Sequence, residues 1–518
     1  MNYIPHSFSR DRKSLATVVL LCILATFLAI RGYPLPYCDD LATIGASISL
    51  AKGGEFTNPY VREWMDAFPT EKPYFYPPGL SYLQGSWLSV FGINAVSLLA
   101  FQWIAILTLT ISSFYFLRVV CNQPKVIGLI AAVSFLLAFQ LEGFRGEVVA
   151  YAIAMTGTCL VFTHRWPIRL SGYFLLAFSG VVYPIAPFIF APLFVAGYLT
   201  LHHETSIFSP QTWRSFARDL PLAFFGGLAA FAIFLWMIKG EFYEFFRVMS
   251  IHKNAAIPGN PWSQLKGYWF ICTAYNQVYI RLPLLIFSSV AVCWSLIQSI
   301  TKKDRTWVIP AFFALACVAS IVTNPMRAKT LVPELQIIIL LVACNHSTRI
   351  TSRLGLTFGV LFLFLINLKT LLGAVLQKPI PSQDLLEIRK AASEIDYANS
   401  RVMIDAWAAR YAYSYNIPAS VIDITTWSIV PKLNRNLPSR QIRPSKIATN
   451  EVWLAANEIY FLIPEDDREK ITKPRAAVAL GRRVPSILES QAKFTILRNP
   501  MPTPASSDGT ASGSEISR

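Results

Sequence analysis

The chain has 518 residues, of which 54% are hydrophobic and only 15% are charged. This composition excludes an ordinary soluble globular protein, because the hydrophobic excess is gathered in long apolar runs of the kind that cross membranes. The formal net charge of +16 indicates cytoplasmic anchoring and contact with anionic membrane lipids, and no nucleic-acid motif is present. The eight cysteines show no spacing that would hold zinc or a metal cluster.

The first apolar segment, about 15–31, follows basic residues as a signal peptide does, but Arg31-Gly32-Tyr33-Pro34 offers no small-residue cleavage site. We therefore expect a retained signal-anchor helix with a cytoplasmic N-terminus. Two adjacent carboxylates, Asp39 and Asp40, lie just beyond it. Either can cap a helix over 41–51. Ionised groups at a membrane edge are costly to desolvate, however, so the pair also indicates a functional site.

Apolar runs long enough to cross about 30 Å of hydrocarbon recur along residues 1–376, which we expect to form a transmembrane domain. Only Tyr183-Pro184 separates the fifth run from the sixth, and this proline could instead kink one long helix. There are about eleven runs: 15–31, 94–119, 126–141, 147–163, 169–183, 185–201, 220–238, 282–300, 306–323, 331–345 and 354–376.

Basic residues support this topology, because they gather in the short connections that become cytoplasmic when the N-terminus is inside. They are Arg10, Arg12, Lys13, Arg118, Lys125, Arg165, Arg169, Arg214, Arg218, Lys302, Lys303, Arg305, Arg349 and Arg353. The outer side then receives two long loops, about 32–93 and 239–281, and the C-terminal region. It also receives a short loop that carries Glu142 to Glu147 and another that carries Arg327 and Lys329. Apolar stretches in the two long loops predict helices that lie on the membrane plane, at 42–51, 80–91, 242–251 and 265–270.

Beyond Gln377 the charge rises and short alternating segments replace the long apolar runs. A helix over 385–395 and strands over 401–405, 420–424, 458–463 and 494–497 predict a small α/β domain at 377–501, on the outer face. Residues 502–518 form a Ser/Gly-rich tail that is expected to be disordered. The sequence thus predicts a mainly α fold, a polytopic transmembrane helical bundle with a small C-terminal α/β domain.

A family resemblance lies in the first outer loop. The order of an apolar helix, Asp39-Asp40, a short helix, Gly53-Gly54, and then Tyr76-Pro77-Pro78-Gly79 before an apolar segment ending Phe91-Gly92 resembles C-type (GT-C fold) integral-membrane glycosyltransferases. It is most similar to the protein O-mannosyltransferase-like branch, which includes the transferases that decorate bacterial lipid A with aminoarabinose. The resemblance implies an active-site carboxylate at Asp39 or Asp40 and a donor sugar carried on a polyprenyl phosphate.

Two further segments are similar to the family. Phe144-Arg145-Gly146-Glu147 stands where the family places another acidic residue, often Asp, although Glu147 could instead only stabilise a helix N-terminus. Arg327 and Lys329 precede a late span, as the family's arginine turn does, and an arginine suits phosphate because it offers paired donors. Either side chain, Lys329 above all, could instead extend to the lipid headgroups. The remaining residues expected at the substrate are Lys72, Tyr76, Arg145 and His252.

These residue types fit glycosyl transfer. A carboxylate within about 3 Å of the acceptor hydroxyl can take its proton as general base, a role expected of Asp39 or Asp40. Arg327 and Lys72 would balance charge on the leaving phosphate. Asp39, Asp40 and Glu147 together could hold Mg²⁺ or Mn²⁺, and the sequence leaves metal dependence open. The resemblance implies inversion of the anomeric carbon, and a lipid, a glycan or a protein as acceptor.

A transporter or flippase of lipid-linked glycans is the main alternative, since intramembrane charges can line a path across the bilayer. The notable charges instead gather at one face, and no inverted repeat is evident. A noncatalytic scaffold gives no reason for Asp39-Asp40. The sequence therefore favours a transferase in the plasma (inner) membrane, acting at the outer face in the synthesis of cell-envelope glycans or glycolipids.

Overall fold

The structure is a computed structural model, and it divides into two compact units, Met1–Ile380 and Pro381–Arg518. The predicted spans from 282 onward, with Arg327 and Lys329, lie outside the residues that it describes. Those residues are 12–30, 40–58, 72–74, 76–120, 128–129, 132–133, 136, 146–188, 190–191, 194, 210–256, 400–404, 422–424, 450–456 and 494–500.

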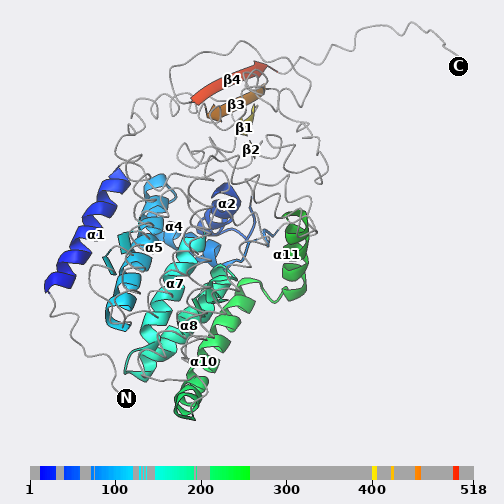
Figure 1. Ribbon diagram of the computed structural model, residues 1–518. Coiled ribbons are helices and arrows are strands. Elements are labelled where there is room, and N and C mark those ends of the chain that lie inside the picture. Colours follow the sequence, from blue (N-terminus) through cyan, green and yellow to red (C-terminus); the bar gives the residue numbers. More distant parts are fainter. Residues whose placement is uncertain are drawn as a thin grey trace, which may run out of the picture. The chain divides into compact units, whose positions relative to one another are not determined.

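The first unit is helical over its described residues (Figure 1). Its helices are α1 (Arg12–Ile30), α2 (Asp40–Ala51), α4 (Gly79–Phe91), α5 (Ala95–Tyr115), the π-helix η3 (Phe116–Val120), α7 (Gly146–Val161), α8 (Trp166–Val182), α10 (Pro210–Met237) and α11 (Phe242–Ala256).

Two described helices are long and apolar enough to cross a membrane, namely Val96–Arg118 and Ala217–Met237. Three shorter apolar helices cover Leu15–Ile30, Gly146–Val161 and Trp166–Val182. Each of the five overlaps a run that the sequence predicts to be a span. The membrane-plane helices predicted at 42–51, 80–91 and 242–251 coincide with α2, α4 and α11.

Helix α5 begins at a side-chain cap, because the Asn94 carboxamide oxygen accepts a hydrogen bond from the Ser97 N–H at 2.8 Å. Such a cap satisfies one of the unpaired amides of the first turn. Farther along, a small apolar core of Leu21, Phe114 and Ala132 joins α1 to α5. Helix α1 therefore packs on α5.

Helices α7 and α8 form an antiparallel hairpin whose backbones approach closely at two glycines. A β-carbon on Gly157 would lie 2.7 Å from the Gly172 carbonyl oxygen, and one on Gly172 would lie 2.9 Å from that of Gly157. Only a residue without a side chain fits at such a crossing, as is common where helices pack within membranes. The two glycines fix how α7 and α8 cross.

The break after α8 resolves the uncertainty at Tyr183-Pro184. Helix α8 ends at Val182, Tyr183 is extended with φ −150° and ψ 109°, and helical backbone resumes at Ala186. Proline disfavours helical geometry in the residue before it, which explains why Tyr183 leaves the helix. The chain therefore forms two helical segments here, and the reading as one kinked helix is wrong.

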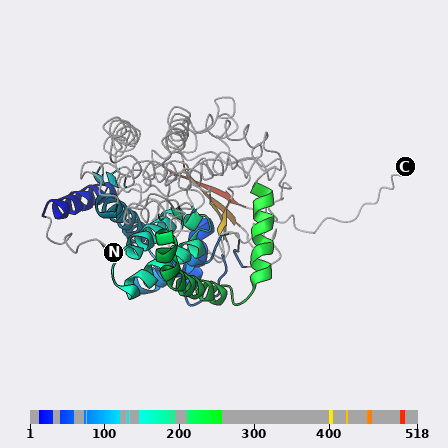
Figure 2. The ribbon, with the colours of Figure 1, turned by 60° about the horizontal axis from the view of Figure 1, so that its bottom comes forward.

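Helix α10 packs beside α8 and runs in the same direction, because residues later in α8 contact residues later in α10. Arg169 contacts Asp219, and farther along Gly226 lies against the backbone of Tyr173 and Phe174. Helix α11 stands apart from the layer of α7, α8 and α10 in two views (Figures 1 and 2). Much of the apolar surface of α10 is exposed, as expected of a lipid-facing helix: Leu220, Phe224, Phe225, Leu228, Phe231 and Trp236.

The second unit holds a four-stranded sheet of order β2-β1-β3-β4, formed by β1 (Ser400–Ile404), β2 (Ile422–Ile424), β3 (Asn450–Ala456) and β4 (Phe494–Pro500). Strand β1 pairs in parallel with β2 and β3, and β4 closes the sheet antiparallel to β3. Three of these strands overlap predicted segments, whereas β3 lies earlier than the strand expected at 458–463, which falls outside the described residues.

Candidate functional site

Three segments that the sequence places on the outer side meet at one end of the helical bundle. A β-carbon on Gly79, the first residue of α4, would lie 2.6 Å from the Val181 carbonyl oxygen at the end of α8. One on Gly146, the first residue of α7, would lie 3.0 Å from Leu80. The starts of α4 and α7 and the end of α8 are therefore in contact. We call this region, together with the end of α10, the loop end.

The end of α10 joins this region through two tyrosines of the first outer loop. The Tyr74 hydroxyl oxygen lies 3.2 Å from the Ile238 carbonyl oxygen, and the Tyr82 hydroxyl donates to the Met237 carbonyl oxygen at 3.1 Å. The ring of Phe56 lies 5.8 Å from each of the two tyrosine rings. Tyr74 is only 1% exposed, so its ring is part of the packing and not a platform for a sugar.

Lys72 forms an ion pair with Glu241, the residue that follows the turn after α10. The other carboxylate oxygen of Glu241 accepts a hydrogen bond from the Tyr74 hydroxyl at 2.9 Å. The hydrogen bond from Lys72 lowers the pKa of Glu241, whereas burial and the neighbouring carboxylate raise the pKa of Tyr74. The Lys72 ammonium, which we expected at a phosphate, is thus held by a carboxylate that the sequence analysis did not select.

Glu147 lies in the first turn of α7 and is 7% exposed. Its neighbour Gly146 touches Leu80, the second residue of α4, so Glu147 belongs to the loop end. A helix N-terminus favours a negative charge, and this position therefore suits a carboxylate whether or not it meets a substrate. The structure places Glu147 beside the Tyr-Pro-Pro-Gly turn and leaves both interpretations open.

The two aspartates are described only in part. Asp40 is the first residue of α2, which is where a capping or first-turn carboxylate is expected, and its side chain lies outside the described structure, as does all of Asp39. Helix α2 meets α4 farther along, where the Ser47 hydroxyl donates to the Gln84 carboxamide oxygen at 2.7 Å. Ser47 lies about 10 Å beyond Asp40 along the helix axis.

The structure describes the remaining predicted site residues to different extents. Tyr76 is half-buried in the turn before α4, and its N–H donates to the Pro73 carbonyl oxygen at 3.4 Å. His252 lies in α11, with a side chain outside the described structure. Arg145, Arg327 and Lys329 lie wholly outside it. Within the described residues, Lys72, Tyr76 and Glu147 are thus brought to one end of the bundle.

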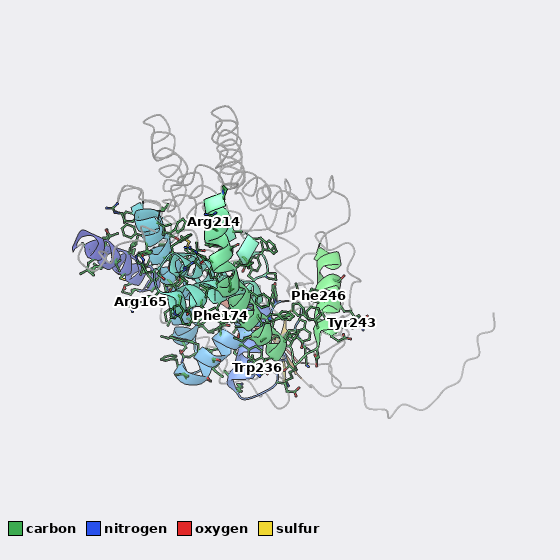
Figure 3. The ribbon with its side chains drawn as sticks, turned by 90° about the horizontal axis from the view of Figure 1, so that it is seen from below. Arg165, Phe174, Arg214, Trp236, Tyr243 and Phe246 are labelled. Atoms are coloured by element: carbon green, nitrogen blue, oxygen red, sulfur yellow. The ribbon has the colours of Figure 1, made fainter. Side chains whose placement is uncertain are left out.

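A second charged cluster, which the sequence analysis did not select, lies at the opposite end of the bundle. Arg169 of α8 forms a largely buried ion pair with Asp219 of α10, and the Tyr173 hydroxyl donates to the second carboxylate oxygen at 3.0 Å. Arg214 lies toward one end of α10 and Trp236 toward the other (Figure 3). A sequence signal did exist, because Asp219 is a lone acidic residue beside an apolar run.

Metal binding cannot be assigned to the described part of the chain. No group of three His, Cys, Asp or Glu residues within it is placed to hold an ion. Of the trio expected from the sequence, only Glu147 has a described side chain. Mg²⁺ or Mn²⁺ at Asp39, Asp40 and Glu147 therefore stays a prediction.

The first unit is thus helical over its described residues, with helices of membrane-spanning length and a polar region where the predicted outer loops meet. No family model matches the sequence, and no curated protein matches it. Four solved chains match the structure, among them ArnT from Cupriavidus metallidurans bound to undecaprenyl phosphate. That likeness covers 93% of this chain and 97% of the other, with a TM-score of 0.43 and 10% identity. So loose a likeness carries no functional argument.

Proposed function

We propose that this chain is a C-type glycosyltransferase of the plasma membrane, which transfers a sugar from a polyprenyl-phosphate donor to an acceptor at the outer face. The observation that carries the proposal is the convergence at the loop end. The first outer loop, with Lys72 and the Tyr76-Pro77-Pro78-Gly79 turn, meets the start of α7, with the buried Glu147, and Glu241 after α10. This is the arrangement that the family resemblance requires of its outer loops.

The proposed reaction is a single displacement. The acceptor hydroxyl oxygen bonds to the anomeric carbon while the bond from that carbon to the phosphate oxygen breaks, and polyprenyl phosphate leaves with the bonding electron pair. Asp39 or Asp40 takes the hydroxyl proton. Lys72 and Arg327 stabilise the negative charge that develops on the phosphate oxygens. Attack from the face opposite the phosphate inverts the anomeric carbon.

The polyprenyl chain explains why such chemistry belongs on a membrane bundle. A polyprenyl tail stays in hydrocarbon, so its phosphate lies at the membrane surface, beside helix ends. Membrane-plane helices such as α2, α4 and α11 line that level in the proposed topology. The acceptor is a lipid, a glycan or a protein, and the proposed pathway is the synthesis of cell-envelope glycans or glycolipids.

Transfer in membranes tests the proposal. Wild-type protein would be supplied with a panel of radiolabelled polyprenyl-phosphate sugars and compared with Asp39→Asn, Asp40→Asn and the double variant at matched expression. We expect the double variant to lose transfer by at least about a hundredfold, the scale of general-base catalysis. The matched control is Glu55→Gln, because Glu55 is an exposed carboxylate of the same loop.

Each outcome bears on a different part of the proposal. Transfer that persists in the double variant would exclude the aspartates as the base. Movement of an intact lipid-linked glycan across vesicles, without transfer, would favour the flippase alternative. Repeating the assay with EDTA and then with added Mg²⁺ or Mn²⁺ decides metal dependence, since a metal-requiring enzyme loses activity and regains it.

A further inference from the structure

The ion pair of Lys72 and Glu241 connects the two outer loops. Lys72 precedes the Tyr-Pro-Pro-Gly turn, whereas Glu241 lies 169 residues later, after α10. Both side chains are partly exposed, at 21% for Lys72 and 36% for Glu241. A ligand arriving at the loop end can therefore reach the pair.

Glu241 is fixed independently of Lys72. The turn before it holds Lys239 at φ 52° and Gly240 at φ 76°, and the Gly240 N–H donates to the Leu235 carbonyl oxygen at 3.0 Å. The Tyr74 hydroxyl holds the second oxygen of the carboxylate, and Tyr74 is itself buried. Glu241 would thus keep a hydrogen bond if Lys72 moved away.

Lys72 is the partner that can exchange. An ammonium on a four-carbon stem carries its charge as a point with rotatable donors, so it can turn from one anion to another. A phosphate at the loop end would offer Lys72 a charge at least as large as that of Glu241. The carboxylate left behind would still accept from Tyr74, and no buried charge would be stranded.

We infer that Glu241 is the resident counter-ion of Lys72, displaced when the phosphate of the polyprenyl lipid binds and restored when that lipid leaves. This inference rests on the proposed function. Glu241 is then a positioning residue, which holds the ammonium at the loop end between turnovers and competes with the phosphate for it. The competition matters most for the product, because polyprenyl phosphate carries more negative charge than the sugar-bearing donor and would otherwise leave more slowly.

The test is equilibrium binding of a short-chain polyprenyl phosphate to the full chain in nanodiscs, with the unphosphorylated polyprenol as control ligand. Glu241→Gln keeps the size of the side chain and an oxygen for Tyr74 but removes the charge. We expect it to tighten phosphate binding about fivefold, the equivalent of about 1 kcal/mol, which is the upper range for a partly exposed ion pair. Lys72→Gln should weaken binding about tenfold.

Two further variants separate charge competition from loop packing. In the Lys72→Gln background, Glu241→Gln should change the Kd by less than about twofold, because the residue acts through Lys72. Tyr74→Phe removes the hydroxyl but keeps the carboxylate, so it should lower the thermal midpoint and leave the Kd of polyprenyl phosphate unchanged. An effect of Tyr74→Phe as large as that of Glu241→Gln would overturn the inference.

The remaining outcomes distinguish the inference from the proposed function. If the wild type prefers polyprenyl phosphate over polyprenol but Glu241→Gln binds it equally or more weakly, the counter-ion role is overturned and the proposed function stands. If the wild type shows no preference for the phosphorylated lipid, both the counter-ion inference and the proposed function are contradicted.

Discussion

The closest approach between the Tyr-Pro-Pro-Gly turn and the bundle predicts that Gly79→Ala is disruptive. Its β-carbon would lie 2.6 Å from the Val181 carbonyl oxygen and 2.8 Å from the Val181 carbonyl carbon, whereas ordinary contact begins near 3.4 Å. The obstacle is backbone and cannot rotate away, so the start of α4 must move by about 0.8 Å. Overpacking of this kind costs about 1–3 kcal/mol of the free energy of unfolding.

Under the proposed function, the same shift should impair sugar transfer more than it impairs folding. A displacement near 1 Å at residues that position a substrate can cost about a hundredfold in rate. We therefore expect Gly79→Ala to lose between about ten- and a hundredfold in sugar transfer, while the purified protein still unfolds cooperatively at a lowered midpoint. The assay pairs transfer in membranes with thermal unfolding of the purified chain.

Gly227→Ala is the matched control, because a β-carbon on Gly227, within α10, would meet no atom within 4 Å. Alanine there should leave transfer unchanged and raise stability by up to about 1 kcal/mol, since alanine is the better helix former. Equal activity and equal unfolding midpoints for Gly79→Ala and Gly227→Ala would refute the argument that α4 is wedged against α8.

Three further predictions concern stability. Asp219→Asn removes the carboxylate charge that pairs with the largely buried Arg169 and should lower the free energy of unfolding by about 3–5 kcal/mol, measured by denaturant titration; a loss below about 1 kcal/mol would contradict it. Gly172→Ala should push α7 from α8 at Gly157 and lower the thermal midpoint, and an unchanged midpoint would show that the crossing can relax. Because the pKa of Glu241 is lowered from 4.5, its ion pair stabilises the fold above about pH 4.5, and this stabilisation is lost as the pH falls through the lowered value. Glu241→Gln should therefore remove this part of the acid dependence of the thermal midpoint. Parallel plots of midpoint against pH for the wild type and Glu241→Gln would contradict the prediction.

The helices of the first unit could be predicted where an apolar run is long and bounded by polar residues. The helix boundaries were harder. Helix α10 begins at Pro210, ten residues before the predicted span, because its first turns are polar and lie beyond the apolar run. The end of α8 could be foreseen at Tyr183-Pro184, but the choice between a kink and a break depends on packing that the local sequence does not contain.

The candidate site was predictable as a set of segments but not as a set of contacts. The polar motifs and the positive-inside pattern predict that 32–93, 239–281 and Glu147 lie on one side. The pairing of Lys72 with Glu241 joins residues far apart in the chain, and the sequence around Glu241 does not predict a contact with Lys72. The same holds for Arg169 and Asp219, whose contact depends on α8 and α10 lying side by side.

The strand order of the second unit has a consequence for how the chain is made. In the described sheet β4 is the outer neighbour of β3, and β4 begins at Phe494 whereas β3 ends at Ala456. At about 5–20 residues per second, translation of the roughly 40 residues between them takes about 2–8 s. During this interval β3 presents an unpaired edge, which is the kind of edge that seeks wrong partners. A ribosome that stalls before Phe494 would therefore leave a sheet open to misassembly, so the last strand sets when this unit becomes safe from aggregation.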